Sequence, residues 1–149
     1  MIVDDHHALV AVIAAEVGDV APVSPMYLDA RIPTTMFLRL VAALHKPVAG
    51  RLSRLLGAAA SEPAHRSILL DRITTPRSTS LTLLDDREVA APIGPLTAEP
   101  GVSLAFAALV AHAVAGGEPI LIDPANEGRW IDSALDRHVE VFSVSIAAT

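Results

Sequence analysis

The chain has 149 residues, enough for a single domain with a sizeable core, and its lack of cysteine excludes disulfides, zinc–thiolate sites and thiol nucleophiles. Hydrophobic residues make up 52% of the chain and aromatic residues only 3%, which favours helices packed on a buried sheet over stacking platforms for single-stranded nucleic acid. The net charge of −6 is unevenly distributed, because residues 31–87 carry nine Lys/Arg against four acids and both flanking segments are acidic. This distribution fits solvated helix faces, or an acidic metal site that faces a basic surface able to hold phosphates.

The N-terminal part of the chain predicts a strand followed by a helix. Residues 1–4 form a short apolar run that ends in an acid and predict the first strand. Helix formers over 6–17 predict a buried helix that ends at Gly18. The segment 18–33 contains three prolines and predicts a loop with at most one short strand.

Three helices are predicted in the middle of the chain. Apolar residues at helical spacing over 34–46 predict the first of them, with Thr34 or Thr35 as its N-cap. The other two are predicted over 48–60 and 63–73.

The C-terminal part completes an alternation of strands and helices. Helices are predicted over 102–115, with Ser103 as N-cap, and over 125–135, whereas 85–101 has three prolines and predicts at most a short helix. Three further strands are predicted over 79–84, 119–122 and 139–144. The alternation predicts one α/β/α domain over 1–149, a three-layer fold in which helices flank a parallel sheet.

Acids follow three of the predicted strands, and the cluster Asp85–Asp86–Glu88 after 79–84 is interpreted as a polar turn, with a displaced metal ligand as the alternative. In a parallel sheet, ligands bind outside the carboxyl ends of the strands, so Asp4–Asp5 and Asp123 are expected to meet in one crevice. Carboxylates are the ligands that Mg²⁺ and Mn²⁺ prefer, and such ions can activate water against a phosphodiester. The alternative is that each aspartate caps the helix that follows it.

Four stretches resemble segments of the PIN-domain ribonucleases, which include the toxins of VapBC-type toxin–antitoxin pairs. They cover the first strand and helix, the second conserved helix, the last helix–turn–strand and the closing strand: IVDDHHALVAVIA, TTMFLRLVAAL, SLAFAALVAHAVAGGEPILID and VEVFSV. The resemblance implies a PIN-like fold, a Mg²⁺- or Mn²⁺-dependent endoribonuclease activity, an RNA substrate, an antitoxin protein as partner and a homodimer.

The family's acids are only partly present. Asp5, or Asp4, matches the first catalytic acid and Asp123 the fourth, so the resemblance implies a metal held by Asp5 and Asp123. Arg39 and Phe106 stand where the second and third acids would be. These departures put catalysis in doubt more than fold, and they leave two hypotheses: a degenerate ribonuclease with reduced activity, or an inert PIN-like domain that binds RNA or a protein partner.

The residues around the predicted crevice carry further expectations. Phe106 should pack at its edge and raise the pKa of nearby carboxylates, while Arg39 should pair with Asp5 or Asp123. The basic middle of the chain predicts that Arg39, Arg51 and Arg54 contact RNA.

The histidines and the tryptophan are expected to have structural roles. The His6–His7 pair is expected to be exposed, with at most one ring facing the crevice. His112 is expected in the core or an interface, and Trp130 in the core with its N–H bonded.

Location and assembly follow from apolar content. No run reaches the roughly 18 apolar residues of a membrane span, and the acids near the N-terminus do not fit a signal peptide, so a cytoplasmic protein without membrane contact is expected. The apolar excess also predicts a homodimer.

Overall fold

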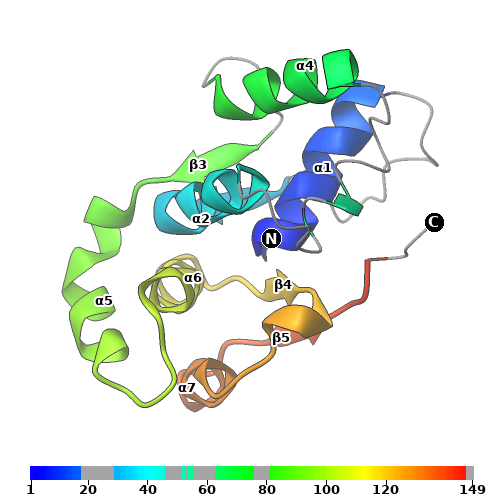
Figure 1. Cartoon of the computed structure of the whole chain (residues 1–149). Coiled ribbons are helices and arrows are strands. Elements are labelled where there is room, and N and C mark those ends of the chain that lie inside the picture. Colours follow the sequence, from blue (N-terminus) through cyan, green and yellow to red (C-terminus); the bar gives the residue numbers. More distant parts are fainter. Residues whose placement is uncertain (18–28, 46–51, 53, 56–62, 76–80, 147–149) are drawn as a thin grey trace.

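The computed structural model of the chain describes residues 1–17, 29–45, 52, 54–55, 63–75 and 81–146 (Figure 1). Within these residues, five parallel strands form one sheet. The strand order is β3-β2-β1-β4-β5. The strands are β1 (Ile2–Val3), β2 (Arg31–Pro33), β3 (Thr82–Leu84), β4 (Ile120–Ile122) and β5 (Val141–Ser143). All four pairings are parallel, which confirms the predicted parallel sheet.

Helices flank the sheet, so the predicted three-layer α/β/α fold is confirmed. The α-helices are α1 (Asp5–Val17), α2 (Thr34–Leu44), α4 (Pro63–Thr74), α5 (Ala90–Thr97), α6 (Leu104–Gly116) and α7 (Trp130–Asp136), with 3₁₀ turns η2 (Asp86–Val89) and η3 (Pro124–Asn126). Most of the helix predicted over 48–60 lies outside the described residues, as does Arg51, although Leu52, Arg54 and Leu55 are helical.

Helix α6 lies at the centre of the molecule and packs against β1, β2 and β4 as well as against α2 and α5. Its alanines explain this position, since small side chains allow a helix to approach the sheet closely, and those at 105, 107, 108, 111 and 113 are buried. The helix ends at Gly117, whose φ of 61° belongs to the left-handed region that glycine adopts without strain.

The order in which strands are added to the sheet reverses between β1 and β4. The first three strands run outward from β1 to one edge of the sheet, and the last two are added on its other side. Such a switch in strand order opens a crevice at the carboxyl ends of the two central strands. Asp4 follows β1 and Asp123 follows β4, so both stand at this crevice.

Two local predictions need correction. Neither Thr34 nor Thr35 is the N-cap of α2; Pro33 holds that position without a side-chain bond, and the carboxylate of Asp86 accepts the Thr35 N–H at 2.8 Å instead. The segment 85–101 is more helical than predicted, because it contains both η2 and α5. Pro92 causes no loss there, since it lies in the first turn of α5, where an N–H has no helical partner.

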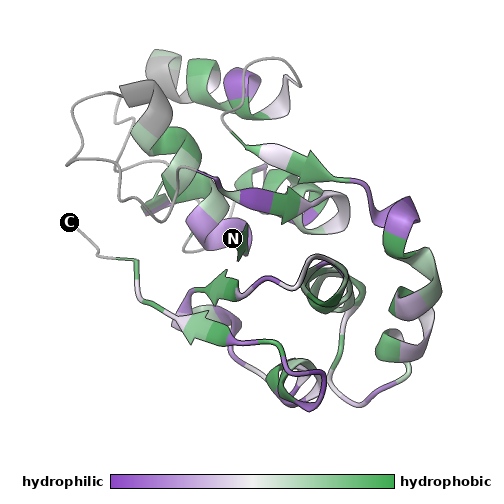
Figure 2. Ribbon diagram, turned by 180° about the vertical axis from the view of Figure 1, so that it is seen from behind, coloured by the Kyte–Doolittle hydropathy of each residue, from purple (hydrophilic) through white to green (hydrophobic). Residues whose placement is uncertain are grey.

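Hydropathy follows this architecture. Figure 2 shows α6 as apolar around its circumference, and the start of α1, beside the N-terminus, as a hydrophilic turn. That turn holds Asp5, His6 and His7. Among the described residues, no helix has the length and apolarity to cross a membrane.

Candidate functional site

Asp4 is completely buried and is held by three donors from two parts of the chain, the start of α1 and the segment after β4. Its Oδ1 accepts the backbone N–H of His7 at 2.8 Å. Its Oδ2 accepts the backbone N–H of Asp123 at 2.8 Å and the side-chain amide of Asn126 at 2.7 Å. Asp4 therefore ties the end of β1 to the segment that follows β4.

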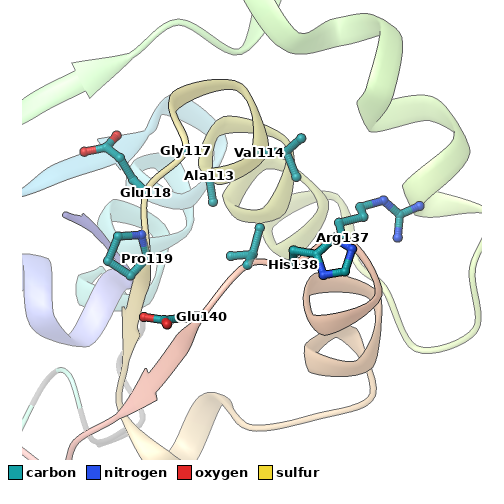
Figure 3. Close-up of a pocket in the computed structure, with 9 residues that line it drawn as sticks. Ala113, Val114, Gly117, Glu118, Pro119, Arg137, His138 and Glu140 are labelled. Atoms are coloured by element: carbon teal, nitrogen blue, oxygen red, sulfur yellow. The ribbon is translucent and has the colours of Figure 1, made fainter.

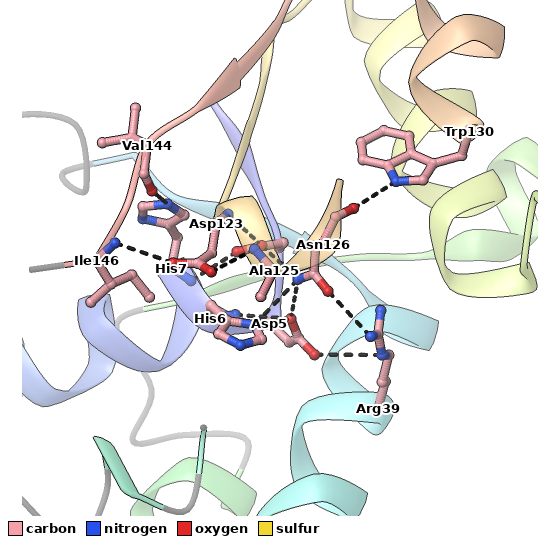
Figure 4. A network of polar contacts seen from close by, with 11 residues as sticks. Asp5, His6, His7, Arg39, Asp123, Ala125, Asn126, Trp130, Val144 and Ile146 are labelled. Carbon is pink, nitrogen blue, oxygen red and sulfur yellow. Dashed lines mark hydrogen bonds and ion pairs between the residues drawn. The ribbon is translucent and has the colours of Figure 1, made fainter. Parts of the chain in front are cut away.

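Asp5 occupies the first turn of α1 and is equally buried, but its partners are mainly side chains. Its Oδ1 lies 2.8 Å from Nδ1 of His6 and accepts the Asn126 amide at 2.8 Å (Figure 4). Its Oδ2 lies 3.5 Å from Nε of Arg39, which comes from α2. The prediction that Arg39 pairs with Asp5 is thus confirmed as a contact.

Arg39 lies on a stack of aromatic rings. Its guanidinium carbon is 4.9 Å from the centre of the Phe106 ring, and its Nη2 donates to Oδ1 of Asn126 at 3.2 Å. The Phe106 ring in turn stacks on Trp130, with centroids 4.9 Å apart and an interplanar angle of 10°. Phe106 therefore packs at the edge of the acidic crevice, as expected from the sequence.

Trp130 joins this stack to the acidic group. It is buried, and its indole N–H donates to the backbone carbonyl of Asn126 at 2.8 Å, as the sequence predicted for a core tryptophan. Asn126 is thereby fixed at its backbone by Trp130 while its side chain reaches Asp4, Asp5 and Arg39.

Asp123 stands beside these residues with its oxygens turned to the backbone. Oδ2 accepts the N–H of Ala125 at 2.9 Å, which caps η3, and Oδ1 accepts the N–H of Ile146 at 3.2 Å, beyond β5. The helix-capping alternative for strand-end aspartates therefore describes the bond from Ala125, whereas Asp123 lies after β4 at the crevice as predicted.

The carboxyl groups of Asp4 and Asp5 differ in their acidity. Burial raises the pKa of Asp4, and the hydrogen bonds that it accepts from His7, Asn126 and Asp123 oppose this rise only in part. Burial also raises the pKa of Asp5, but the His6 hydrogen bond and the Arg39 charge together bring it below its ordinary value. The expectation that pKa values rise beside Phe106 thus fails for Asp5, because the hydrogen bond from His6 and the charge of Arg39 outweigh burial.

His6 completes the acidic group. Burial alone would lower the pKa of its imidazole, but the hydrogen bond and charge of Asp5 raise it above the ordinary value. The prediction of an exposed histidine pair is wrong: His6 and His7 are both buried, and His7 lies 2.9 Å from the carbonyl oxygen of Val144. The two rings do point to different partners, as adjacent residues at a helix start must.

A divalent cation fits the chemistry of this group. Asp4, Asp5 and His6 each offer a ligand atom, and these atoms lie within 4.8 Å of one another. Two carboxylate oxygens and one imidazole nitrogen suit Mn²⁺ better than Mg²⁺, which prefers an all-oxygen set. The Asp4–Asp5–His6 group could therefore hold a metal ion, provided that the internal hydrogen bonds yield to it.

Asn126 is the residue that sequence reasoning missed. It lies four positions after the end of β4, and the 3₁₀ turn η3 folds it back over the strand end. An amide offers both a donor and an acceptor, so Asn126 can bind two carboxylates and a guanidinium at once. A polar residue shortly after a predicted strand end was the available signal.

A second carboxylate–histidine pair lies farther along the same edge of the sheet. Asp86, after β3, accepts the backbone N–H and the hydroxyl of Thr35 and lies 2.8 Å from Nε2 of His112. His112 is buried, as predicted. The hydrogen bonds of this Asp86–His112 pair join η2, α2 and α6, and those described do not reach the Asp4–Asp5–His6 group.

A separate hollow of about 230 Å³ opens at the opposite end of the sheet, where β4 and β5 begin (Figure 3). Glu118, Arg137, His138 and Glu140 line it together with Ala113, Val114, Gly117, Pro119 and Val139. Its charges are already engaged in part, because Arg137 pairs with Glu99 at 2.5 Å and Glu118 with Arg31. The hollow is also smaller than most small-molecule sites, which occupy about 300–1,000 Å³.

No protein-family model, curated protein or solved structure matched this chain in the comparisons with known proteins.

Proposed function

We propose that this chain is a PIN-like domain with a degenerate ribonuclease site, whose metal-dependent cleavage of RNA is reduced. The observation that carries the proposal is the contact of Arg39 with Asp5 at 3.5 Å and with Asn126 at 3.2 Å. A guanidinium beside these oxygens opposes the approach of a second cation. An internal counterion thus replaces the ion that a metal-dependent nuclease requires.

The residues divide into those that would hold a cation and those that restrain it. Asp5 and His6, with Asp4 behind them, would supply the ligands, and a bound divalent ion would supply an activated water for attack on a phosphodiester. Asn126 orients both carboxylates through its amide. Phe106 contributes no ligand and excludes water from one side of the site.

RNA is the partner that the proposal assigns. Arg39 is 40% exposed at its side chain, and Arg54 is exposed on its helical turn, so both are available to phosphates. We further propose an antitoxin protein as second partner, from the resemblance, and a homodimer, from the resemblance and the apolar composition. A cytoplasmic location is proposed from the sequence composition.

Restoring the missing acids tests this function. Wild type is compared with the Arg39→Glu, Phe106→Asp double variant by calorimetric titration with Mn²⁺ and by cleavage of a mixed RNA substrate. We expect wild type to bind Mn²⁺ weakly and to cut little RNA, and the variant to bind Mn²⁺ at least about tenfold more tightly. Arg87→Glu, a charge change on an exposed side chain, is the matched control.

The opposite result is equally clear. Wild type that cleaves RNA efficiently, and that loses cleavage in Asp5→Ala, would contradict a degenerate site. A variant that folds but gains no Mn²⁺ affinity would show that Arg39 is not what keeps the cation out.

An inert binding domain is the second candidate, and the aromatic stack favours it. Phe106 fills a position where the resemblance places an acid, and it is fixed between Arg39 and Trp130. A ring fixed in this way serves packing and recognition and gives nothing to metal chemistry. RNA binding without cleavage at any Mn²⁺ concentration would select this candidate.

A further inference from the structure

We infer that Arg39 is an exchangeable counterion: a phosphodiester oxyanion draws its guanidinium outward, the oxygens it leaves accept a divalent cation, and the two ligands therefore bind cooperatively. The inference rests on the proposed function, because it assumes that the acidic group is closed by Arg39. It adds a condition under which the site opens.

The two oxygens that Arg39 contacts have few other partners. Oδ1 of Asp5 accepts from His6 and Asn126, whereas within the described part of the chain Oδ2 meets only the Arg39 guanidinium. Oδ1 of Asn126 likewise receives its one bond there from Arg39. Withdrawal of this side chain would release one carboxylate oxygen and one amide oxygen on the same side of the site, both of them hard donors.

These two oxygens bind the Arg39 guanidinium weakly. The 3.5 Å contact with Asp5 is longer than an ordinary hydrogen bond, and each partner is met by a single nitrogen. Arg87 provides a contrast, since both its Nε and its Nη2 donate to Asp85, at 3.0 and 2.7 Å. Arg39 is also 40% exposed, while the Asp5 side chain is 2% exposed.

The aromatic stack guides the movement. The guanidinium carbon of Arg39 lies over the Phe106 ring, 4.9 Å from its centre, and the Phe106 ring stacks on the buried Trp130. A cation–π contact uses none of the guanidinium N–H donors, and these donors are the groups that bind a phosphate. Arg39 can therefore turn from the carboxylate toward an outer oxyanion without losing its cation–π contact.

Charge makes the two events cooperative. When Arg39 turns outward, Asp5 remains buried with one counter-charge fewer, which is costly in a low-dielectric site. A divalent cation at the released oxygens removes that cost. By linkage, each ligand must raise the affinity for the other by the same factor.

The test measures this coupling in both directions. Mn²⁺ affinity is determined calorimetrically with and without a short 2′-O-methyl RNA, and the RNA affinity is determined with and without Mn²⁺, after correction for Mn²⁺ bound by the RNA alone. We expect each ligand to raise the affinity for the other about fivefold or more. Trp130, the sole tryptophan, should report Arg39 withdrawal as a change in fluorescence when RNA binds.

Two variants separate coupling from bulk charge effects. Arg39→Gln should bind Mn²⁺ more tightly than wild type without RNA and should show no coupling. Arg87→Gln, which removes the same charge from an exposed turn, should keep the coupling of wild type.

Three outcomes would contradict different parts of the inference. Equal Mn²⁺ affinities with and without RNA, including no binding in either case, overturn the coupling and leave a degenerate site standing. Coupling that persists in Arg39→Gln overturns the role of Arg39. Tight Mn²⁺ binding and RNA cleavage by wild type would instead contradict the proposed function itself.

Discussion

Asp5 and Asp86 occupy equivalent places in the sheet. Each is the second residue after a parallel strand, each lies 2.8 Å from a histidine ring nitrogen, and each contacts α2. Asp86 binds Thr35 at the start of that helix, and Asp5 meets Arg39 one turn later.

Their partners nevertheless differ in kind. Asp86 accepts a backbone N–H at a helix start, and its other oxygen meets a histidine, so its role is that of a helix cap and an interface bond. Asp5 meets an imidazole, an amide and a half-exposed guanidinium, with a second buried carboxylate beside it. An aspartate after a strand is thus a structural feature when backbone donors satisfy it, and a candidate site when movable side chains do.

Removing Asp4 should break the acidic region most severely. Asp4→Ala removes the acceptor of three buried hydrogen bonds, which are donated by the backbone N–H groups of His7 and Asp123 and by the Asn126 amide. We expect a loss of about 3 kcal/mol or more in the free energy of unfolding, measured with denaturant. Asp136→Ala, at an exposed position, should change it by less than about 0.5 kcal/mol. Equal effects for the two variants would show that Asp4 is not a structural tie.

Converting Asn126 to aspartate should sharpen the distinction between structure and site. Asn126→Asp removes the amide donor from two carboxylates and adds a third, so the protein should lose about 2 kcal/mol of stability without metal. Mn²⁺ should restore that stability, and its affinity should rise by about tenfold in calorimetry. Ala125→Asp adds the same charge at an exposed neighbouring position, and it should neither raise the Mn²⁺ affinity nor make the stability depend on Mn²⁺. A destabilised variant that Mn²⁺ fails to rescue would contradict the cation site.

Breaking the second pair should affect stability alone. Asp86→Ala removes the acceptor at the start of α2 and the partner of His112, which should cost about 1 kcal/mol. Mn²⁺ and RNA affinities should stay as in wild type, because no bond of Asp86 reaches Asp5. Denaturant unfolding and calorimetry on the same samples measure both. A changed Mn²⁺ affinity would mean that the two regions communicate through α2.

The sequence was sufficient to predict the contacts that depend on strand direction alone. Parallel strands end at one edge, so the meeting of Asp4 with the segment at Asp123 followed from their positions after two buried strands. It did not predict that Asp86 would bond to Thr35, because 51 residues separate the two and no local pattern records such a contact. Burial of His6 and His7 was missed because an N-terminal polar pair reads as exposed until a sheet edge and β5 cover it.

The smallest expected effect concerns the proton on His6. Asp5 raises the pKa of this imidazole above its unfolded value, so the folded state holds the proton more tightly than the unfolded state does. The resulting stabilisation is complete below about pH 6.5, the ordinary value, and is lost as the pH rises through the folded-state pKa. The difference in unfolding free energy between wild type and His6→Gln should therefore shrink as the pH rises above about 6.5. His138→Asn, which removes an exposed histidine from a position with positive φ that asparagine tolerates, controls for the loss of a ring elsewhere. A difference that grows with rising pH would mean that His6 is held neutral, and that Arg39 alone balances the charge of Asp5.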